Sequence, residues 1–358
     1  MGNMFEYIHQ IEFRKIPAGY FSFGLEWSKK EFVEKADRYK IPIEWLIKEV
    51  PANQVFLDDF EISETQITVG MMADFYKDNP KLTIPEEIQS NIDQQNMKLP
   101  AYPVSYETAL AFCSWLSFVL GEVIDLPTEP EWEKSAKGMR GNIFPWGDEE
   151  NHEIPNIRVG GIKSTPQNVK SCTQNVSDYG VYDLAGNVEE WTRSFNKPYK
   201  NNKIVYSDQL NYPILRGGTC EHAIDLARST RRHGNHPSLY TGFRVVKRKN
   251  LNNLTSHMYE LNQDHRLIAK GDFILGKISS IGEDHISIHL VNDSYAKVSL
   301  DTIPTHVIEL FGSFKNKDSE MLLKVEKVEG ENYHCTKPTL EEIDTFLASN
   351  PVAGVRRS

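Results

Sequence analysis

Two stretches of the chain predict helices, one from apolar side chains at helical spacing and one from the residues at its two ends. The first, SYETALAFCSWLSFVLG, begins at Ser105, a residue type suited to an N-cap, and closes at Gly121, where a helix commonly ends. The second, PTEPEWEKSAKG, carries Pro130 in its first turn, carboxylates near its positive end and Gly138 as its stop. We predict one helix in each stretch.

The last third of the chain has the alternating period of strands. Apolar and polar residues alternate in KGDFILGKISSIGEDHISIHLVNDSYAKVSL and again in SEMLLKVEKVEGENYHCTKP, with turn residues between the runs. Five short strands in this span predict a small closed barrel. In the stretch that follows, Thr339 and Glu342 form a capping-box pattern, so we expect a short helix that ends before Pro351.

Elsewhere helices are few, and short strands alternate with long loops rich in Gly, Pro and Trp. A domain with so little periodic structure has to be held by buried side-chain-to-backbone bonds or by ions. The loops rich in Gly, Pro and Trp stop near Val246, and a polar stretch follows. We therefore expect an α+β chain with a large irregular domain, a linker, a small β-barrel, and a short helix with a tail. The expected boundaries are 1–248, 249–263, 264–338 and 339–358.

Composition narrows the function classes. The chain has 358 residues, 39% of them apolar, which is enough for a sizeable core. Its formal net charge of -10 argues against a general binder of nucleic acid or anionic membranes. No apolar run is long enough to span a bilayer, and no export signal is visible, so we expect a cytoplasmic protein without a membrane partner. The cysteines are scattered without a CxxC pair, which is typical of free thiols: Cys113, Cys172, Cys220 and Cys335.

The stretch YDLAGNVEEWT gathers polar side chains on a turn. Its Gly-Asn pair tolerates positive φ, and the Asn187 side chain can bond to nearby backbone. The carboxylates of Glu189 and Glu190 follow directly, beside Trp191. Such oxygens suit a hard cation or the capping of a buried backbone corner. The residues alone leave both interpretations open, together with a plain turn that leads into a short strand.

Nine blocks of the sequence together resemble a known family. In order, they are IPAGYFSFG, FEISETQITVGMMADF, YPVSYETALAFCSWL, LPTEPEWEKSAKG, FPWGDE, YGVYDLAGNVEEWT, LRGGTC, ARSTRR and GFRVV. They are similar to blocks of the formylglycine-generating-enzyme, or sulfatase-modifying-factor, family. The resemblance runs from Ile16 to Val246 and implies a variant of the C-type lectin fold for the large domain.

The resemblance also implies a structural calcium in the Gly-Asn turn. Its ligands would be Asn187 and Glu190, with the backbone of Val188 between them. The alternative is that Asn187 and Glu190 bond to backbone in a core without a cation. Three arginines match arginines of the family and are expected to be buried and bonded to carbonyls and carboxylates such as Glu129 or Glu131: Arg216, Arg232 and Arg244.

The family's formylglycine chemistry depends on two cysteines that bind copper as thiolates. Here the matching block reads RGGTCEHAIDLARSTRR, and after Cys220 no cysteine follows before Cys335. A site with two sulfur ligands cannot be built from Cys220 alone. We therefore expect Cys220 to be a small buried residue, with a reactive thiol as the alternative.

Histidines offer another route to metal chemistry. His222, His233 and His236 lie close together in sequence and could gather with Cys220 as ligands of zinc, copper or iron. The alternative is that the loop histidines face solvent or cap backbone.

The barrel resembles an OB-fold of the S1 type. S1 modules that bind RNA present stacking aromatics and a basic face, and the best candidates here are His289, Tyr295 and Lys297. The segment from residue 251 onward has more Asp and Glu than Lys and Arg, so each of the three has an ordinary solvated strand face as its alternative.

These observations favour a recognition or assembly module on a scaffold of the formylglycine-generating-enzyme type, without formylglycine-forming activity. A protein partner is expected, and loops rich in Tyr, Asn and Ser around 193–212 and 231–242 offer contact area. The first alternative is a metal-dependent oxidoreductase of the sulfatase-modifying-factor family. The second is an RNA-binding accessory protein that acts through the barrel.

Overall fold

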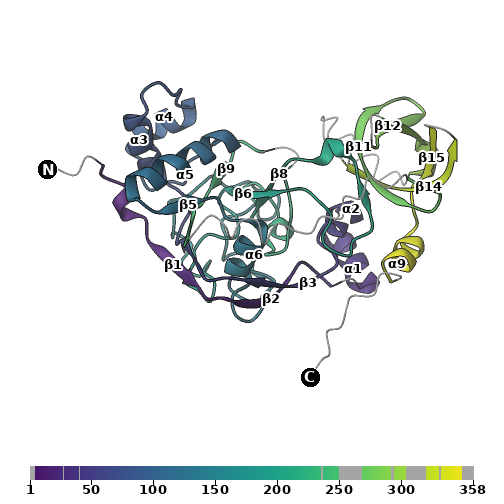
Figure 1. Ribbon diagram of the computed structural model, residues 1–358, viewed down its shortest axis with the longest axis horizontal. Helices are drawn as coiled ribbons and strands as arrows, with labels where there is room; N and C mark the ends of the chain where they lie inside the picture. The colour runs from purple at the N-terminus through teal and green to yellow at the C-terminus, as the bar shows by residue number, and fades with distance from the viewer. Residues whose placement is uncertain are drawn as a thin grey trace. The chain divides into compact units, whose positions relative to one another are not determined.

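The computed structural model describes residues 5–26, 28–39, 41–234, 237–249, 268–291, 294–303, 320–329 and 332–348. These residues form two compact units, each assembled from segments far apart in the sequence. The first unit holds the described residues up to Phe23, then Gln54–Ser194, and then those from Pro213 to Lys249. The second holds those in Gly24–Asn53 and Phe195–Tyr212, and the described residues from Ile268 onward. Figure 1 labels many of the elements along the chain.

Three small sheets frame the first unit. One is antiparallel with the order β1-β4-β10-β5, one has the order β8-β6-β9 with β6 and β9 parallel, and one pairs β2 with β3. The strands are β1 (Phe13–Ile16), β2 (Gly19–Phe23), β3 (Asn53–Leu57), β4 (Phe60–Ser63), β5 (Val123–Asp125), β6 (Glu189–Phe195), β8 (Pro213–Arg216), β9 (Thr241–Phe243) and β10 (Val246–Arg248). The helices are η1 (Ile8–Gln10), α3 (Val69–Asp78), α4 (Glu86–Asp93), α5 (Tyr106–Leu120), α6 (Glu129–Lys137) and η3 (Ile224–Ala227).

Both helices predicted for this part of the chain are confirmed. In α5, the side chain of Ser105 accepts the N–H of Thr108 at 3.1 Å, and Gly121 closes the helix in the left-handed region at φ 66. The apolar stripe of α5 packs into the main core of the unit, together with α3 and the aromatic ring of Phe243.

Helix α6 is buried along its whole length, charged side chains included. A capping box between Thr128 and Glu131 starts it, and Gly138 ends it. Its carboxylates Glu129 and Glu133 are neutralised by buried arginines from other segments. The helix that the sequence predicted from its caps is therefore the centre of an ion-pair network.

The second unit is built around a five-strand antiparallel near-barrel. Its strand order is β13-β12-β11-β14-β15, and β13 lies close to β15 at the far side. The strands are β11 (Phe273–Ile281), β12 (His285–His289), β13 (Tyr295–Ser299), β14 (Glu320–Glu329) and β15 (Asn332–Thr336). Ile274, Ile286 and Ile288 belong to an apolar cluster that fills its interior. The predicted strand pattern is confirmed.

Two segments that precede the barrel strands in the sequence, within 24–53 and 195–212, complete this unit. They contribute α1 (Lys29–Tyr39), α2 (Ile43–Ile47), β7 (Val205–Tyr206) and η2 (Asp208–Leu210), next to the C-terminal η4 (Leu300–Thr302) and α9 (Leu340–Ala348). Strand β7 runs parallel to β11, with Val205 opposite Ile274. Phe273 and Leu275 alternate with the inward residues of β11 and join a second cluster with Leu46 and Leu210.

Buried polar contacts bind the same segments to the barrel strands. Glu44 of α2 accepts the N–H of Leu322 at 3.3 Å and pairs with Lys337. The ammonium of Lys48 lies 2.7 Å from the carboxylate of Glu320, with both side chains buried.

The stretch 193–212, expected to be loop, contributes β7, η2 and the buried side chains of Ile204 and Leu210 to the second unit. The predicted linker 249–263 lies outside the described residues apart from Lys249, and the sequence-based boundaries stay a prediction. The C-terminal helix is confirmed, with the Thr339–Glu342 capping box in place. No helix in the described part of the chain is long and apolar enough to cross a bilayer.

Candidate functional site

The Gly-Asn turn is a tight corner that feeds β6. Asp183, Gly186 and Asn187 all adopt left-handed backbone, with φ of 58, 76 and 66. A Cβ on Gly186 would lie 2.4 Å from the carbonyl oxygen of Asn156, so only glycine fits there. The corner therefore directs the next few residues into the core.

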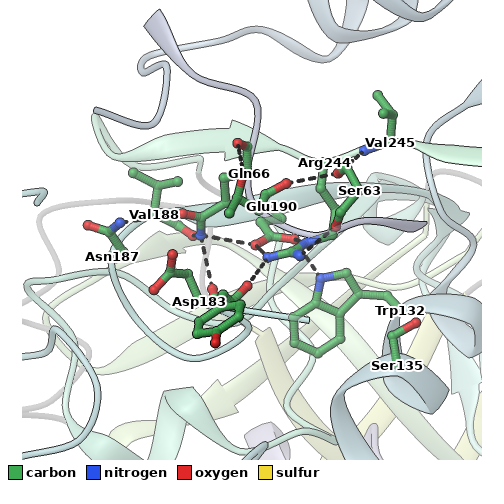
Figure 2. A network of polar contacts seen from close by, with 12 residues as sticks. Ser63, Gln66, Trp132, Ser135, Asp183, Asn187, Val188, Glu190, Arg244 and Val245 are labelled. Carbon is green, nitrogen blue, oxygen red and sulfur yellow. Dashed lines mark hydrogen bonds and ion pairs between the residues drawn. The ribbon is translucent and has the colours of Figure 1, made fainter. Parts of the chain in front are cut away.

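Glu190 lies at the centre of a buried network (Figure 2). Its carboxylate accepts two bonds from the guanidinium of Arg244, at 2.6 and 2.8 Å, and one from the indole N–H of Trp132 at 2.7 Å. The charge of Glu190 is thus matched by one arginine in a fork geometry.

Asn187 bonds to backbone and side-chain amides on both sides. Its Oδ1 accepts the N–H of Gln167 at 2.9 Å and a side-chain N–H of Asn156 at 3.2 Å. Its Nδ2 donates to the carbonyl of Gln167 at 3.1 Å and to Oε1 of Gln66 at 3.4 Å. Asn187 is therefore fully engaged in capping the corner.

In this structure, the oxygens of Val188 and Glu190 that were predicted to bind calcium accept hydrogen bonds from a side-chain nitrogen. The Nε2 atom of Gln66 donates to the carbonyls of Asp183 and Val188, both at 3.1 Å, and to Oε1 of Glu190 at 3.0 Å. A cation between Val188 and Glu190 does not fit this donor set. Among the described residues, no group of three or more His, Cys, Asp or Glu side chains is placed to hold a metal ion. The calcium stays a prediction of the resemblance.

Gln66 is the member of this network that sequence reasoning missed. Its only signal was an amide in the block FEISETQITVGMMADF, and its bond to Glu190 spans 124 residues. A hydrogen bond between residues so far apart in the sequence cannot be predicted from a short stretch of it.

The three arginines expected to be buried are buried. Arg216 pairs with Glu133 at 2.6 Å and Arg232 with Glu129 at 2.9 Å, while Arg244 holds Glu190. Glu131, the other carboxylate considered as a partner, pairs instead with Arg248, which holds the pKa of Glu131 below its usual range against the effect of burial.

Cys220 is a buried free thiol. Burial, with the nearby Glu221 carboxylate, raises its pKa to about 12, so the thiolate is rare at neutral pH. This matches the expected small buried residue.

Two of the candidate histidines meet beside Glu189. The rings of His222 and His233 are 5.8 Å apart and edge to face, and Nδ1 of His233 lies 2.8 Å from the Glu189 carboxylate. Burial lowers the pKa of His222 to about 4, and its Nδ1 accepts the N–H of Thr219 at 3.1 Å. Burial alone would raise the pKa of Glu189, but the two histidines hold it at about 2. His236 lies outside the described residues.

The barrel candidates lie on neighbouring strands with different exposure. His289 on β12 is buried, and its Nδ1 lies 3.0 Å from the hydroxyl of Ser207. Tyr295 on β13 is 54% exposed and packs edge to face on His289. Lys297, two residues further along β13, is exposed on the same strand face. Only Tyr295 and Lys297 are presented to solvent.

Comparison with known proteins gives one family match. The model of the "Sulfatase-modifying factor enzyme 1-like domain" family matches residues 10–249. The chain is 26% identical over 242 residues to "Uncharacterized protein YfmG" of Bacillus subtilis, covering 57% of this chain and 47% of that protein. It is 33% identical over 156 residues to mouse "Inactive C-alpha-formylglycine-generating enzyme 2", covering 40% of this chain and 46% of that protein.

Among solved structures, PvdO from Pseudomonas aeruginosa aligns at 20% identity with a TM-score of 0.49, over 66% of this chain and 93% of that one. The chain spans about half the length of the curated relatives it matches, 47% of one and 46% of the other.

Proposed function

The chain belongs to the family of sulfatase-modifying factor enzyme 1-like domains, and we propose that it is a recognition or assembly module without formylglycine-forming activity. The observation that carries this proposal is Cys220. Its thiol is buried with a pKa of about 12, in the block where the family's copper chemistry needs two thiolates.

The other two cysteines of the first unit are also held as thiols by burial. Cys113 lies in the apolar core on α5, where burial raises its pKa well above the usual range. The pKa of Cys172 is raised by burial as well, and its thiol lies 4.0 Å from the amide oxygen of Gln167. The inactivity stated in the name of the mouse relative supports the same conclusion for this chain.

We place the recognition surface on the loop that precedes β9. Leu239 is 48% exposed, and Tyr240 next to it packs edge to face on Tyr102 with ring centres 5.2 Å apart. An exposed leucine beside a supported tyrosine pair gives apolar contact area at low entropy cost, which suits a protein partner. The other candidate loop, 193–212, contributes β7 and the buried side chains of Ile204 and Leu210 to the second unit.

Two experiments test this function. Copper-loaded protein incubated with a peptide that carries the sulfatase motif Cys-x-Pro-x-Arg should yield no formylglycine by mass spectrometry, and detectable aldehyde overturns the proposal. In affinity capture from the native host, a partner retained by wild type should be lost with Leu239→Asp and kept with Leu82→Asp, a control leucine that is 44% exposed. Equal capture by both variants removes this surface from the proposal.

A metal-dependent oxidoreductase is the second candidate, favoured by the contact between His222 and His233. The carboxylate of Glu189 orients His233 through Nδ1, which is the usual support of a metal-binding imidazole. Copper or iron would supply the redox chemistry, and these two histidines would hold it. After loading and desalting, metal should then be retained by wild type and lost in His233→Ala. Equal metal content in both proteins rejects this candidate.

We further propose that the barrel is an OB-fold of the S1 type that binds single-stranded RNA weakly. Its strand order, with β11 paired to both β12 and β14 and with β13 near β15, supports the OB assignment. Only Tyr295 and Lys297 of the candidate residues reach solvent, which leaves one aromatic for stacking. Sub-micromolar affinity at physiological salt, measured by fluorescence anisotropy, would contradict weak binding.

A further inference from the structure

Three oxygens converge on one nitrogen inside the Gly-Asn corner (Figure 2). They belong to the carbonyls of Asp183 and Val188 and to the carboxylate of Glu190, and the nitrogen is Nε2 of Gln66. All four side chains are buried. A converging set of oxygens in a core needs a donor or a cation to offset its cost of burial.

The orientation of the Gln66 amide follows from a backbone N–H. Gln167 donates its N–H to Oδ1 of Asn187, so the other end of that amide, Nδ2, has to face Gln66. Nδ2 donates to Oε1 of Gln66, and the Nε2 atom of Gln66 is left facing the three oxygens. The network leaves no freedom to turn either amide over.

Distances in the corner suit an N–H donor. The three oxygens lie 3.0 to 3.1 Å from Nε2, as in ordinary N–H to O hydrogen bonds. A calcium ion binds oxygens at about 2.3 to 2.6 Å, so a cation at the same point would need the corner to contract by roughly half an ångström on every side.

The charge balance of the corner also disfavours a calcium ion. Glu190 carries the one carboxylate among the three oxygens, and Arg244 already neutralises it through two bonds. A divalent cation beside Arg244 would add positive charge to a buried site where the Glu190 carboxylate already has its counter-charge.

We propose that the Gln66 carboxamide takes the place of the calcium ion that the resemblance predicts for this corner, so that the protein folds and stays folded without calcium. A neutral side chain contributed by the block before α3 thereby does what an ion would otherwise do. This proposal is independent of the proposed recognition function.

The first test uses the wild-type chain of 358 residues. After exposure to millimolar CaCl2 and desalting, elemental analysis should find no stoichiometric calcium, and the Tm in EDTA should equal the Tm in CaCl2. The resemblance predicts the opposite, a Tm that falls on chelation. One bound calcium per chain together with an EDTA-dependent Tm overturns the proposal.

The second test is Gln66→Glu, which keeps the shape of the side chain and replaces its donor nitrogen by a charged oxygen. In EDTA we expect Tm to fall by about 5 to 10 °C, because four oxygens then face one another in the core. Gln54→Glu, at an exposed position of β3, adds the same charge and should leave Tm nearly unchanged. A Gln66→Glu protein as stable in EDTA as wild type shows that Nε2 is not the donor and overturns the proposal.

Discussion

At the scale of single residues, the core of the first unit depends on buried carboxylates that are matched by buried cations. Glu190 is the clearest example, since Arg244, Trp132 and Gln66 all donate to its two oxygens. Such a carboxylate adds little net stability compared with an apolar residue, but its removal leaves a buried charge without compensation.

Glu190→Ala should therefore cost about 3 to 5 kcal/mol of unfolding free energy, because the guanidinium of Arg244 loses its counter-charge in the core. Urea unfolding followed by circular dichroism measures this. The control is Glu12→Ala, which removes the 64% exposed carboxylate of a surface pair with Arg14 and should cost less than about 1 kcal/mol. Similar losses in the two variants would mean that Arg244 is solvated and that the network is not closed.

Asp183 gives the corner a pH dependence. Burial raises the pKa of its carboxyl to about 6, although the N–H of Lys170 donates to it and Arg244 is near. Because the folded pKa is above the unfolded value, the folded protein holds this proton more tightly. The stability from Asp183 is therefore fully present below the unfolded pKa of 3.8 and is lost as pH rises through about 6.

Asp183→Asn should stabilise the protein at pH 8 by up to about 3 kcal/mol, since the amide stays neutral and asparagine tolerates the left-handed backbone. Near pH 4 the gain should disappear, because the wild-type carboxyl is then protonated. Thermal unfolding of both proteins across this pH range tests the sign. A variant that is less stable than wild type at pH 8 shows that the ionised carboxylate has a favourable partner there.

At the scale of elements, the Gly-Asn corner is fixed by space as well as by backbone angle. Gly186 has no room for a Cβ, whereas Gly160 has the same left-handed backbone with φ of 58 and nothing within 4 Å of the position of a Cβ. The two glycines therefore separate backbone strain from crowding.

Gly186→Ala should cost about 3 kcal/mol or more, because strain of about 1 to 2 kcal/mol adds to a contact with the Asn156 carbonyl that cannot relax. Gly160→Ala should cost only about 1 kcal/mol, from strain alone. Chemical denaturation of the two variants gives the difference directly. If their costs are equal, the corner opens easily, and its close contact with Asn156 does not hold the fold.

At the scale of the whole molecule, neither unit is a continuous piece of chain. The barrel strands carry a second apolar face, with Phe273, Leu275 and Leu322, and that face packs against residues of 24–53 and 195–212. A fragment limited to the barrel sequence would expose this face to water.

We therefore expect residues 264–348, produced alone, to be unfolded or aggregated. In a proton–nitrogen NMR correlation spectrum, the amide signals of this fragment should be poorly dispersed. In the full chain, Leu46→Asp should unfold the second unit first, because it places a charge in the shared cluster. The control Leu25→Asp changes a partly buried residue at the margin of that cluster and should have a smaller effect. A well-dispersed spectrum from the fragment would show that the barrel folds independently.

Local signals in the sequence determined three of the helices (α5, α6 and α9), the barrel strands and the family, whereas α1 to α4 were not predicted. Caps at Ser105, Thr128 and Thr339 each lie within a few residues of the helix they start, and alternation of apolar residues is a property of one strand. The blocks that led to the family are likewise short and ordered, and the family model spans the same part of the chain. Burial of Cys220 and of the family arginines could also be predicted, since it follows from the fold.

Only the tertiary structure decided which residues from distant segments pair with one another. The oxygens of Val188 and Glu190 were visible as candidates in a single turn, but the nitrogen that faces them comes from Gln66, which is 124 residues from Glu190. In the same way, 193–212 was expected to be loop, whereas β7 within it pairs with β11. Short windows of sequence encode backbone geometry and periodicity, whereas the pairing of buried polar groups depends on where distant segments close on one another. A neutral amide and a calcium ion can satisfy the same oxygens, so the choice between them is made by the folded chain.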